Sequence, residues 1–446
     1  MASHNHHVSE HDLEEKFVFS DGLRKVIFTL LAIGLFCTVL GIVLLSMGGG
    51  EHATEGHALV LNDKDNITLV SNENVESEGH HAYHWTTRVK ANLWLNVIFF
   101  MGITVIGLFF TALQYASHSG WSALIKRVPE AYGAFFPVIG VIMVVVFGLS
   151  YHELFHWTDA SLLEEGGKNY DSIIAGKSGF LNMTGFVIRM TIFVLGWYAF
   201  YTQIRKNSLL EDLHGGTKYF WKMKTISTVF IIFFGISESI SAWDWILSID
   251  THWFSTMFGW YVFASWHVTG LATIALAVMY LKDAGYLKMV NENHLHDLGK
   301  FVFAFSVFWT YIWFAQFLLV YYANIPEETV YFMERLNSDY YKKFIFINLF
   351  LNFFFPFLGL MTRNAKRKAI LLKIVCFVVI VGHFLDFYLM IMPGTLKEHG
   401  GFGFLEIGMP LVFAAIFIFV VARNLAKPAL IAKNHPMLDE SIHHHI

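Results

Sequence analysis

The stretch VIFTLLAIGLFCTVLGIVLLSM, residues 26–47, contains no charged residue and is long enough to cross a lipid bilayer as an α-helix. The rest of the chain is similar: of its 446 residues, 55% are hydrophobic, 17% are aromatic and only 15% are charged. With this composition, a soluble protein of the same size would have too few polar residues to cover its apolar surface. The sequence therefore predicts a protein that is surrounded by lipid.

Ten apolar stretches of this kind follow one another along the chain. Each is about 20 residues long, the length that spans the hydrocarbon core of a bilayer. Strands of an outer-membrane barrel are about half as long and alternate polar with apolar residues, so we expect an all-α integral membrane protein. The predicted spans are residues 26–47, 93–115, 131–150, 183–204, 226–245, 258–280, 301–322, 344–361, 370–392 and 405–422.

Lys and Arg are unevenly distributed between the two sides of the membrane. The two tails and the loops on their side carry more than twice as many as the opposite loops. Basic residues concentrate on the cytoplasmic side, so both termini are predicted to lie in the cytoplasm. We interpret Arg205, Lys206 and the basic run 363–368 as topology anchors, and we expect no nucleic-acid partner.

The number and position of the cysteines limit which cofactors this chain can bind. Only two occur, Cys37 and Cys376, and both fall inside predicted spans. An iron–sulfur cluster needs more thiolates, and covalent haem needs a Cys-x-x-Cys-His motif, which the sequence lacks. His267 and His383 alone are too few to predict a b-type haem. We therefore expect that this chain itself binds no cofactor and no metal.

Ionisable side chains inside the spans are the main functional signal, because burying them in hydrocarbon is costly and they often mark proton or ion paths. His383 and Asp386 are three residues apart on one helix face, where the carboxylate can hold the imidazole directly or through water. Such a pair can pass a proton. The proton-pathway candidates are His383, Asp386, His267, Glu238, Asp244 and Lys373.

A structural interpretation of the same residues stays open. Arg189 in the fourth span is a candidate for an ion pair with Glu238 or another carboxylate that fixes helix packing. Lys373 lies close to the cytoplasmic edge, where its side chain can reach the headgroups. A chain that needed only packing would use small residues, so the group as a whole favours proton transfer.

The outer end of the third span combines imidazole, carboxylate and aromatic side chains. His152, Glu153 and His156 are candidates for a site that faces a quinone head group or for a proton exit. An interfacial belt of aromatic residues is the alternative, and the sequence alone favours the belt.

Two longer stretches carry a resemblance to a known family. Residues 239–261 read SISAWDWILSIDTHWFSTMFGWY, and residues 313–329 read WFAQFLLVYYANIPEET. They resemble an outer turn, and a glutamine-bearing helix with its Asn-Ile-Pro-Glu-Glu turn, in the ActF subunit of alternative complex III. That complex is a bacterial quinol oxidoreductase unrelated to the cytochrome bc complexes. The resemblance extends from the first span to the last.

The resemblance implies two four-helix bundles, spans 2–5 and 6–9, as in the membrane subunit of polysulfide reductase, with the first and last spans peripheral. It implies the bacterial inner membrane as the location. The expected regions are the cytoplasmic tail 1–25, the peripheral span 26–47, the acidic periplasmic loop 48–88, the first bundle 89–246, the second bundle 257–392, the peripheral span 405–422 and the cytoplasmic tail 423–446.

The resemblance also implies partners that carry the cofactors. These are multihaem and single-haem cytochromes c, an iron–sulfur subunit, and a sister membrane subunit, ActC, with the better-supported quinol site. A terminal cytochrome oxidase is a further expected partner. By this analogy, the chain is a scaffold and a proton-conducting subunit that is not catalytic alone. Quinol oxidation in a neighbour would drive protons through the second bundle, with Asp244 and Glu238 near the outer opening.

Two other interpretations remain. A secondary transporter for an ion or a small anion also places charge inside the membrane, and broken helices in two matching halves would favour it. Pro137, Pro356 and Pro410 lie inside spans but form no such repeated pair. A passive membrane anchor is the third interpretation, in which neutralising the buried acids would change assembly alone.

Overall fold

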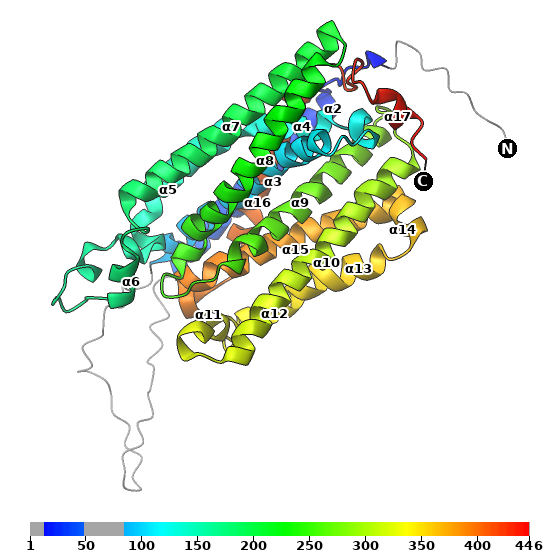
Figure 1. Cartoon of the computed structure of the whole chain (residues 1–446). Helices are drawn as coiled ribbons and strands as arrows, with labels where there is room; N and C mark the ends of the chain where they lie inside the picture. The colour runs from blue at the N-terminus through cyan, green and yellow to red at the C-terminus, as the bar shows by residue number, and fades with distance from the viewer. Residues whose placement is uncertain (1–12, 49–83, 446) are drawn as a thin grey trace, which may run out of the picture.

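The computed structural model describes residues 13–48 and 84–445, and these residues fold into α-helices without a β-strand (Figure 1). Ten helical segments are long and apolar enough to cross a membrane. The chain is therefore an all-α integral membrane protein, as the sequence predicts. Most of the expected acidic loop (49–83) and part of the expected N-terminal tail (1–12) lie outside the described residues.

The ten spanning segments agree with the ten predicted stretches. They are α2 (Asp21–Gly48), α3 (Trp85–Ala116), α4 with α5 (Arg127–Tyr132 and Phe136–Leu154), α7 (Met183–His214), α8 (Lys218–Trp245), α9 (Met257–Asp283), α10 (Glu292–Ala323), α12 with α13 (Tyr341–Leu349 and Phe355–Gly359), α15 (Ala369–Leu396) and α16 (Phe404–Leu425). The connections contain α6 (Ser172–Lys177), α11 (Pro326–Leu336), α14 (Arg363–Arg367) and α17 (Leu438–Ile442).

Short turns of other helix types interrupt or extend these segments. The 3-10 turns are η1 (Trp121–Leu124), η2 (Gly133–Phe135), η3 (His156–Thr158), η4 (Ala160–Leu162), η5 (Leu247–Ile249) and η7 (Lys397–His399). The turn η6 (Phe350–Phe354), between α12 and α13, is π-helical. Pro356 follows it and cannot donate to the carbonyl of Asn352, which explains why the backbone widens at this point.

Some helices are longer than hydropathy indicates. α3 begins at Trp85 and not at residue 93, and α7 continues from residue 204 to His214. Hydropathy detects only the part of a helix that lies in hydrocarbon, so polar extensions beyond the membrane are missed.

α15 passes through Pro393, although the prediction ended this span at residue 392. A proline has no N–H for the carbonyl four residues earlier, here that of Leu389. The Nε of Arg335, in α11, donates to this oxygen at 2.9 Å. Because a side chain replaces the missing donor, the helix continues to Leu396.

α3 lies at the centre of the molecule. In its most apolar stretch of 18 consecutive residues, 89% are buried, against 17% in the corresponding stretch of α2. α3, α5, α7 and α8 are neighbours in one group of helices, and α9, α10, α15 and the α12–α13 segment are neighbours in another (Figure 1). The two groups meet where α3 and α8 pack against α9 and where α3 packs against α15.

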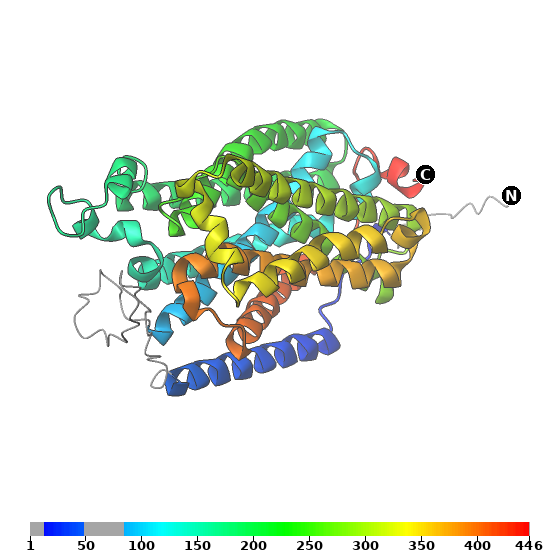
Figure 2. The ribbon, with the colours of Figure 1, turned by 90° about the horizontal axis from the view of Figure 1, so that it is seen from below.

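α2 and α16 lie side by side at one edge of the molecule (Figure 2). A Cβ atom on Gly41 would lie 2.6 Å from the backbone nitrogen of Leu405, and one on Gly408 would lie 2.5 Å from that of Thr38. The missing side chains therefore let the two backbones approach closely. This contact pairs the first span with the last.

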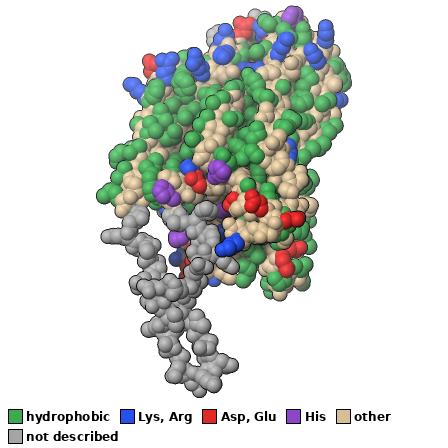
Figure 3. All heavy atoms as spheres, turned by 90° about the vertical axis from the view of Figure 1, so that its left-hand side faces the viewer, with side chains coloured by type: hydrophobic (Ala, Val, Ile, Leu, Met, Phe, Trp, Pro, Cys, Tyr) green, Lys and Arg blue, Asp and Glu red, His purple; other side chains and the backbone are tan. Residues whose placement is uncertain are grey.

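The two described tails meet at the same end of the molecule. Leu430 donates its backbone N–H to the carbonyl of Glu15 at 2.8 Å, and Lys433 pairs with Glu14. Figure 3 shows Lys and Arg gathered at this end, apolar side chains over the flank, and acidic and histidine side chains near the opposite end. We call the end with the tails the tail end and the opposite end the far end.

Candidate functional site

Asp386 in α15 is fully buried and is surrounded by hydrogen-bond donors from three other helices. Its Oδ1 accepts from the Tyr261 hydroxyl (2.5 Å) and from Nδ2 of Asn348 (2.8 Å). Its Oδ2 accepts from Nε1 of Trp309 (2.9 Å) and from the Ser265 hydroxyl (3.0 Å). Since all four partners are neutral donors, they stabilise the ionised carboxylate without an ion pair.

His383 lies one turn from Asp386 and joins it through a hydroxyl group. The direct separation of Nδ1 and Oδ2 is 3.9 Å, too long for a hydrogen bond. The Oγ of Ser265 lies 2.9 Å from that Nδ1 and 3.0 Å from that Oδ2. The sequence predicted a direct or water-bridged contact, and the structure places a serine from α9 between the two groups.

With an ionised Asp386, the hydrogen bonds are compatible with only one tautomer of neutral His383. Ser265 has one hydroxyl hydrogen, and an ionised Asp386 can only accept, so Ser265 donates to Asp386 and accepts from His383. His383 therefore carries its hydrogen on Nδ1 when neutral. Its Nε2 keeps a free lone pair, and this atom is buried without a hydrogen-bond partner among the described residues. Nε2 is thus the basic atom of the cluster.

Asn348 is itself held by a second amide. Nδ2 of Asn352, in the π-helical turn η6, donates to Oδ1 of Asn348 at 2.6 Å. Gly382 provides the space for it, because a Cβ there would lie 2.2 Å from Oδ1 of Asn352. The chain Asn352, Asn348, Asp386 therefore points its donors in one direction, toward the carboxylate.

His267 is not joined to this cluster by the described hydrogen bonds. Its ring packs against Phe305 (4.2 Å between ring centroids), Phe263 (5.2 Å) and Phe109 (5.4 Å). Neither ring nitrogen has a hydrogen-bond partner among the described residues, and the side chain is buried. His267 lies two positions after Ser265 in α9 and so faces a different side of that helix.

Arg189 pairs with Asp244 and not with Glu238. Its Nε and Nη2 donate to the two carboxylate oxygens at 2.6 and 2.8 Å. This bidentate pair links α7 to α8 and occupies the buried Asp244, which was expected near the outer opening of the pathway. Glu238 is also buried, but its Oε1 has no hydrogen-bond partner among the described residues.

Lys373 lies apart from the Asp386 cluster. It forms an ion pair with Asp283 at the end of α9, close to the tail end of the molecule. The structure therefore places Lys373 in a helix–helix contact.

The three candidates at the outer end of the third span lie near the surface. Glu153 pairs with Lys90 of α3 at 2.5 Å. His152 and His156 are exposed, and the ring of His152 lies 4.0 Å from that of Tyr151. This arrangement fits an interfacial belt better than an enclosed quinone site.

The two stretches that carry the family resemblance contact each other at the far end. Nε1 of Trp253 donates to the carbonyl of Glu328 at 2.9 Å, and Nε2 of Gln316 donates to the hydroxyl of Ser255 at 2.9 Å. The chain matches no protein-family model and no curated protein. Membership of the ActF family therefore remains a prediction from these stretches.

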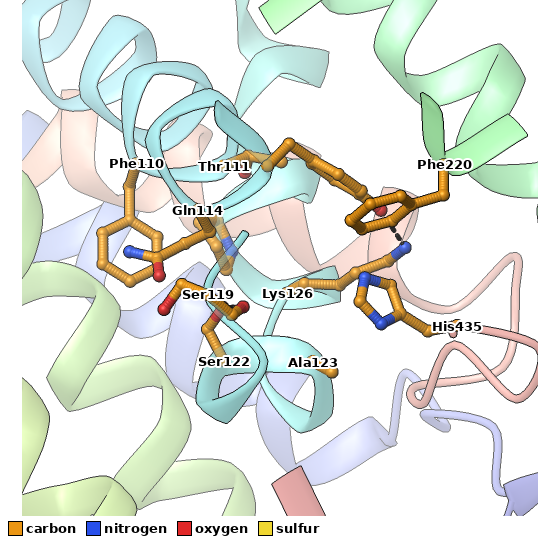
Figure 4. Close-up of a pocket in the computed structure, with 11 residues that line it drawn as sticks. Phe110, Thr111, Gln114, Ser119, Ser122, Ala123, Lys126, Phe220 and His435 are labelled. Atoms are coloured by element: carbon orange, nitrogen blue, oxygen red, sulfur yellow. Dashed lines mark hydrogen bonds between the residues drawn. The ribbon is translucent and has the colours of Figure 1, made fainter. Parts of the chain in front are cut away.

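A buried ionic cluster at the tail end was missed by the sequence reasoning. It surrounds a narrow pocket between α3, α8 and the C-terminal segment (Figure 4). Lys126 contacts the Tyr115 hydroxyl and pairs with Glu211 at 2.8 Å. Burial lowers the pKa of Lys126, and burial together with the nearby Lys126 and Arg127 lowers the pKa of His435 to about 2.

Arg127 extends this cluster. It pairs with Glu130 at 2.8 Å and with Asp212, and Arg205 pairs with Glu130 at 2.9 Å. Arg205 is thus a buried structural residue as well as a topology anchor. Opposite charges within a few residues of two span ends are the signal that could have indicated the cluster.

A second missed cluster lies at the far end. Arg335 pairs with Asp250 at 2.9 Å, and its guanidinium lies 3.4 Å from the centre of the Tyr331 ring. Tyr331 stacks on Trp253, with 4.0 Å between ring centroids, and burial raises the pKa of its hydroxyl. Asp250 and Trp253 lie in the stretch 239–261, but no local signal indicated that Arg335 would be buried beside them.

Proposed function

We propose that this chain is a membrane subunit of a bacterial quinol-oxidising respiratory complex of the alternative complex III type. In this proposal it lies in the inner membrane with both termini in the cytoplasm. It serves as a scaffold and conducts protons that are driven by quinol oxidation in a neighbouring subunit. The observation that carries the proton-conducting role is the serine bridge between His383 and Asp386.

The bridge has the properties that proton transfer requires. Imidazole is the side chain whose ordinary pKa lies closest to neutral pH, and Nε2 of His383 is free to accept a proton. The resulting positive charge is balanced by Asp386 through the Ser265 hydroxyl. A buried polar atom without a partner needs a physical explanation, and exchange of a proton with transient water is the one proposed for this nitrogen.

Other buried groups are candidates for the rest of the path. His267 and Glu238 each have a buried polar atom without a partner among the described residues, as expected for groups that bind transient water. Asp244 and Lys373 are held in ion pairs and fit a structural role better. We therefore propose that the path to and from His383 runs through buried groups that are not held in ion pairs.

The cofactors and the quinol site belong to partners in this proposal. Haem c and iron–sulfur clusters would lie on cytochrome and iron–sulfur subunits, and an ActC-like membrane subunit would bind quinol. A terminal cytochrome oxidase would accept the electrons directly or through a cytochrome. The apolar flanks would contact lipid and the sister membrane subunit.

The identity of the complex is tested by purification. The chain carries a tag on one tail and is extracted in mild detergent, and the quinol-reduced minus oxidised visible spectrum of the co-purifying material is recorded. Haem bands that appear with quinol support the proposal. A chain that purifies alone and colourless, under conditions that preserve other membrane complexes, contradicts it and favours a transporter.

The proton-conducting role is tested by Asp386→Asn. We expect the complex to assemble, because the amide still accepts hydrogen bonds. Proton release per electron should fall, because proton transfer through the cluster slows by about 100-fold, the usual contribution of a positioned acid–base group. Proton release per electron is measured in proteoliposomes. Glu406→Gln is the matched control, because Glu406 is equally buried but pairs with Arg88 elsewhere. Equal proton release in Asp386→Asn and parent removes Asp386 from the pathway.

A further inference from the structure

The Asp386 cluster contains one feature that the proton-conducting role leaves unexplained: the amide pair of Asn348 and Asn352. Both side chains are buried, and Oδ1 of Asn352 has no hydrogen-bond partner among the described residues. Leaving a polar atom unpaired in this way is costly. π-Helical turns such as η6, which carries Asn352, often occur at functional sites. The pair therefore needs a physical explanation beyond packing.

The amide pair restricts what Asp386 can do. A side-chain amide has one donor end and one acceptor end, and Asn352 donates to the acceptor end of Asn348. The donor end of Asn348 must then face Asp386, as the 2.8 Å contact shows. Trp309 is also a donor only. On each carboxylate oxygen, one partner is thus unable to accept a proton from Asp386.

The two remaining partners are hydroxyl groups, and both are already engaged. Tyr261 donates to Oδ1, and Ser265 donates to Oδ2 while it accepts from Nδ1 of His383. A proton placed on Oδ1 would turn Tyr261 into an acceptor, and one placed on Oδ2 would reverse Ser265 and move the hydrogen of His383 to Nε2. Either position removes a donor that stabilises the carboxylate. The same proton placed on Nε2 of His383 breaks none of these bonds.

We propose that Asn348, held by Asn352, is a positioning residue that keeps Asp386 ionised, so that the proton carried by this cluster resides on Nε2 of His383. The step is a simple protonation: the neutral imidazole with hydrogen on Nδ1 gains a proton on Nε2 and becomes imidazolium. The negative charge of Asp386 balances it through Ser265. Toward the far end, the opposite charges of Arg335 and Asp250 neutralise each other.

This inference rests on the proposed proton-conducting role, but its test does not need the complex or turnover. The full chain is placed in lipid nanodiscs, and infrared difference spectra between acid and neutral pH are recorded. The carbonyl band of a protonated carboxylic acid and the ring bands of imidazolium are separate signatures. In the parent we expect an imidazolium signal that disappears in His383→Gln, and no acid band that disappears in Asp386→Asn.

Asn348→Leu removes a donor from Asp386 at nearly constant volume. We expect the carboxylic-acid band of Asp386 to appear in this variant. The band should be absent from the double variant Asn348→Leu with Asp386→Asn, which lacks that carboxyl group. Asn352→Leu leaves Asn348 free to turn its carbonyl toward Asp386, so the same band should appear with lower intensity. This milder variant keeps the test valid if Asn348→Leu folds poorly. Asn207→Leu, a buried amide in α7, is the control and should resemble the parent.

An acid band from Asp386 in the parent, or parent-like spectra from both Asn348→Leu and Asn352→Leu, overturns the inference. Failure of the proposed function is a separate result. If Asp386→Asn leaves proton release unchanged while the spectra match expectation, the positioning stands and the proton-conducting role falls. If proton release falls in Asp386→Asn but Asp386 is protonated in the parent, the role stands and the positioning is wrong.

Discussion

Asp386 and Asp244 show two ways in which this chain accommodates a buried carboxylate. Asp244 receives a full positive charge from Arg189 in bidentate geometry. Asp386 receives four neutral donors and a neutral imidazole behind a serine. The charge of Asp244 is already balanced by Arg189, whereas an ionised Asp386 surrounded by neutral donors can be balanced by a proton that His383 gains and loses. We therefore assign Asp244 a structural role and propose the proton-conducting role for Asp386.

The ion pair gives a stability prediction. Arg189→Ala leaves the buried Asp244 without its counter-charge, and we expect the free energy of unfolding to fall by about 3 kcal/mol. Thermal stability of the full chain in detergent measures it. Arg189→Ala combined with Asp244→Asn should lose less than Arg189→Ala alone, because the unpaired charge is then gone. A single variant as stable as the parent would show that the pair contributes nothing.

At the scale of elements, two prolines shape the helices around the site in different ways. Pro356 is preceded by the π-helical turn η6, which places Asn352. Pro393 removes a donor from the carbonyl of Leu389, and Arg335 replaces it. In both places the missing N–H of proline is matched by a specific arrangement nearby. Broken backbone hydrogen bonding in the membrane is tolerated only with such replacements.

A double-mutant cycle tests the replacement at Pro393. Arg335→Met should lower the free energy of unfolding by about 4 kcal/mol, because the buried Asp250 loses its counter-charge and buried carbonyl groups lose their donor. Pro393→Ala restores the backbone N–H, so in that background the loss should be smaller by about 1 kcal/mol. Thermal unfolding of the four proteins measures the coupling. Pro410→Ala, a proline inside α16, is the control and should leave the Arg335→Met effect unchanged. Additive effects would contradict the role of Arg335.

At the scale of the whole molecule, the first and last spans pack against each other at one edge. α2 contributes few buried residues to the rest of the chain and packs mainly on α16, which in turn contacts α3. The described tails meet at the tail end, where Lys and Arg side chains gather. An even number of spans makes this arrangement possible, and the excess of Lys and Arg predicts that this end faces the cytoplasm.

The close approach of α2 and α16 can be tested with one methyl group. Gly41→Ala places a Cβ against the backbone of Leu405, so we expect the helices to separate and stability to fall by about 1–3 kcal/mol. Gly148→Ala is the control, because a Cβ there meets no atom within 4 Å. The midpoint of thermal unfolding in detergent is compared. Equal midpoints for Gly41→Ala and Gly148→Ala would show that the two helices are not held by this contact.

The sequence alone determined the all-α membrane class, the ten spans, the charge difference between the two sides and the ionisable residues within the predicted spans. Hydropathy and charge are local properties that sum along one helix, so no partner is needed to detect them. The proximity of His383 and Asp386 was also foreseen, because both lie on one turn of one helix, but the serine between them was not.

Only the tertiary structure decided which groups these residues meet. Ser265 lies 118 positions from His383 along the chain and 121 from Asp386, and Arg335 reaches Asp250 from a connection that hydropathy does not mark as a span. The choice of Asp244 over Glu238 by Arg189 depends on the rotation of α7 against α8. Rotation and depth are set by side-chain packing among several helices at once, and no single stretch of sequence contains that information.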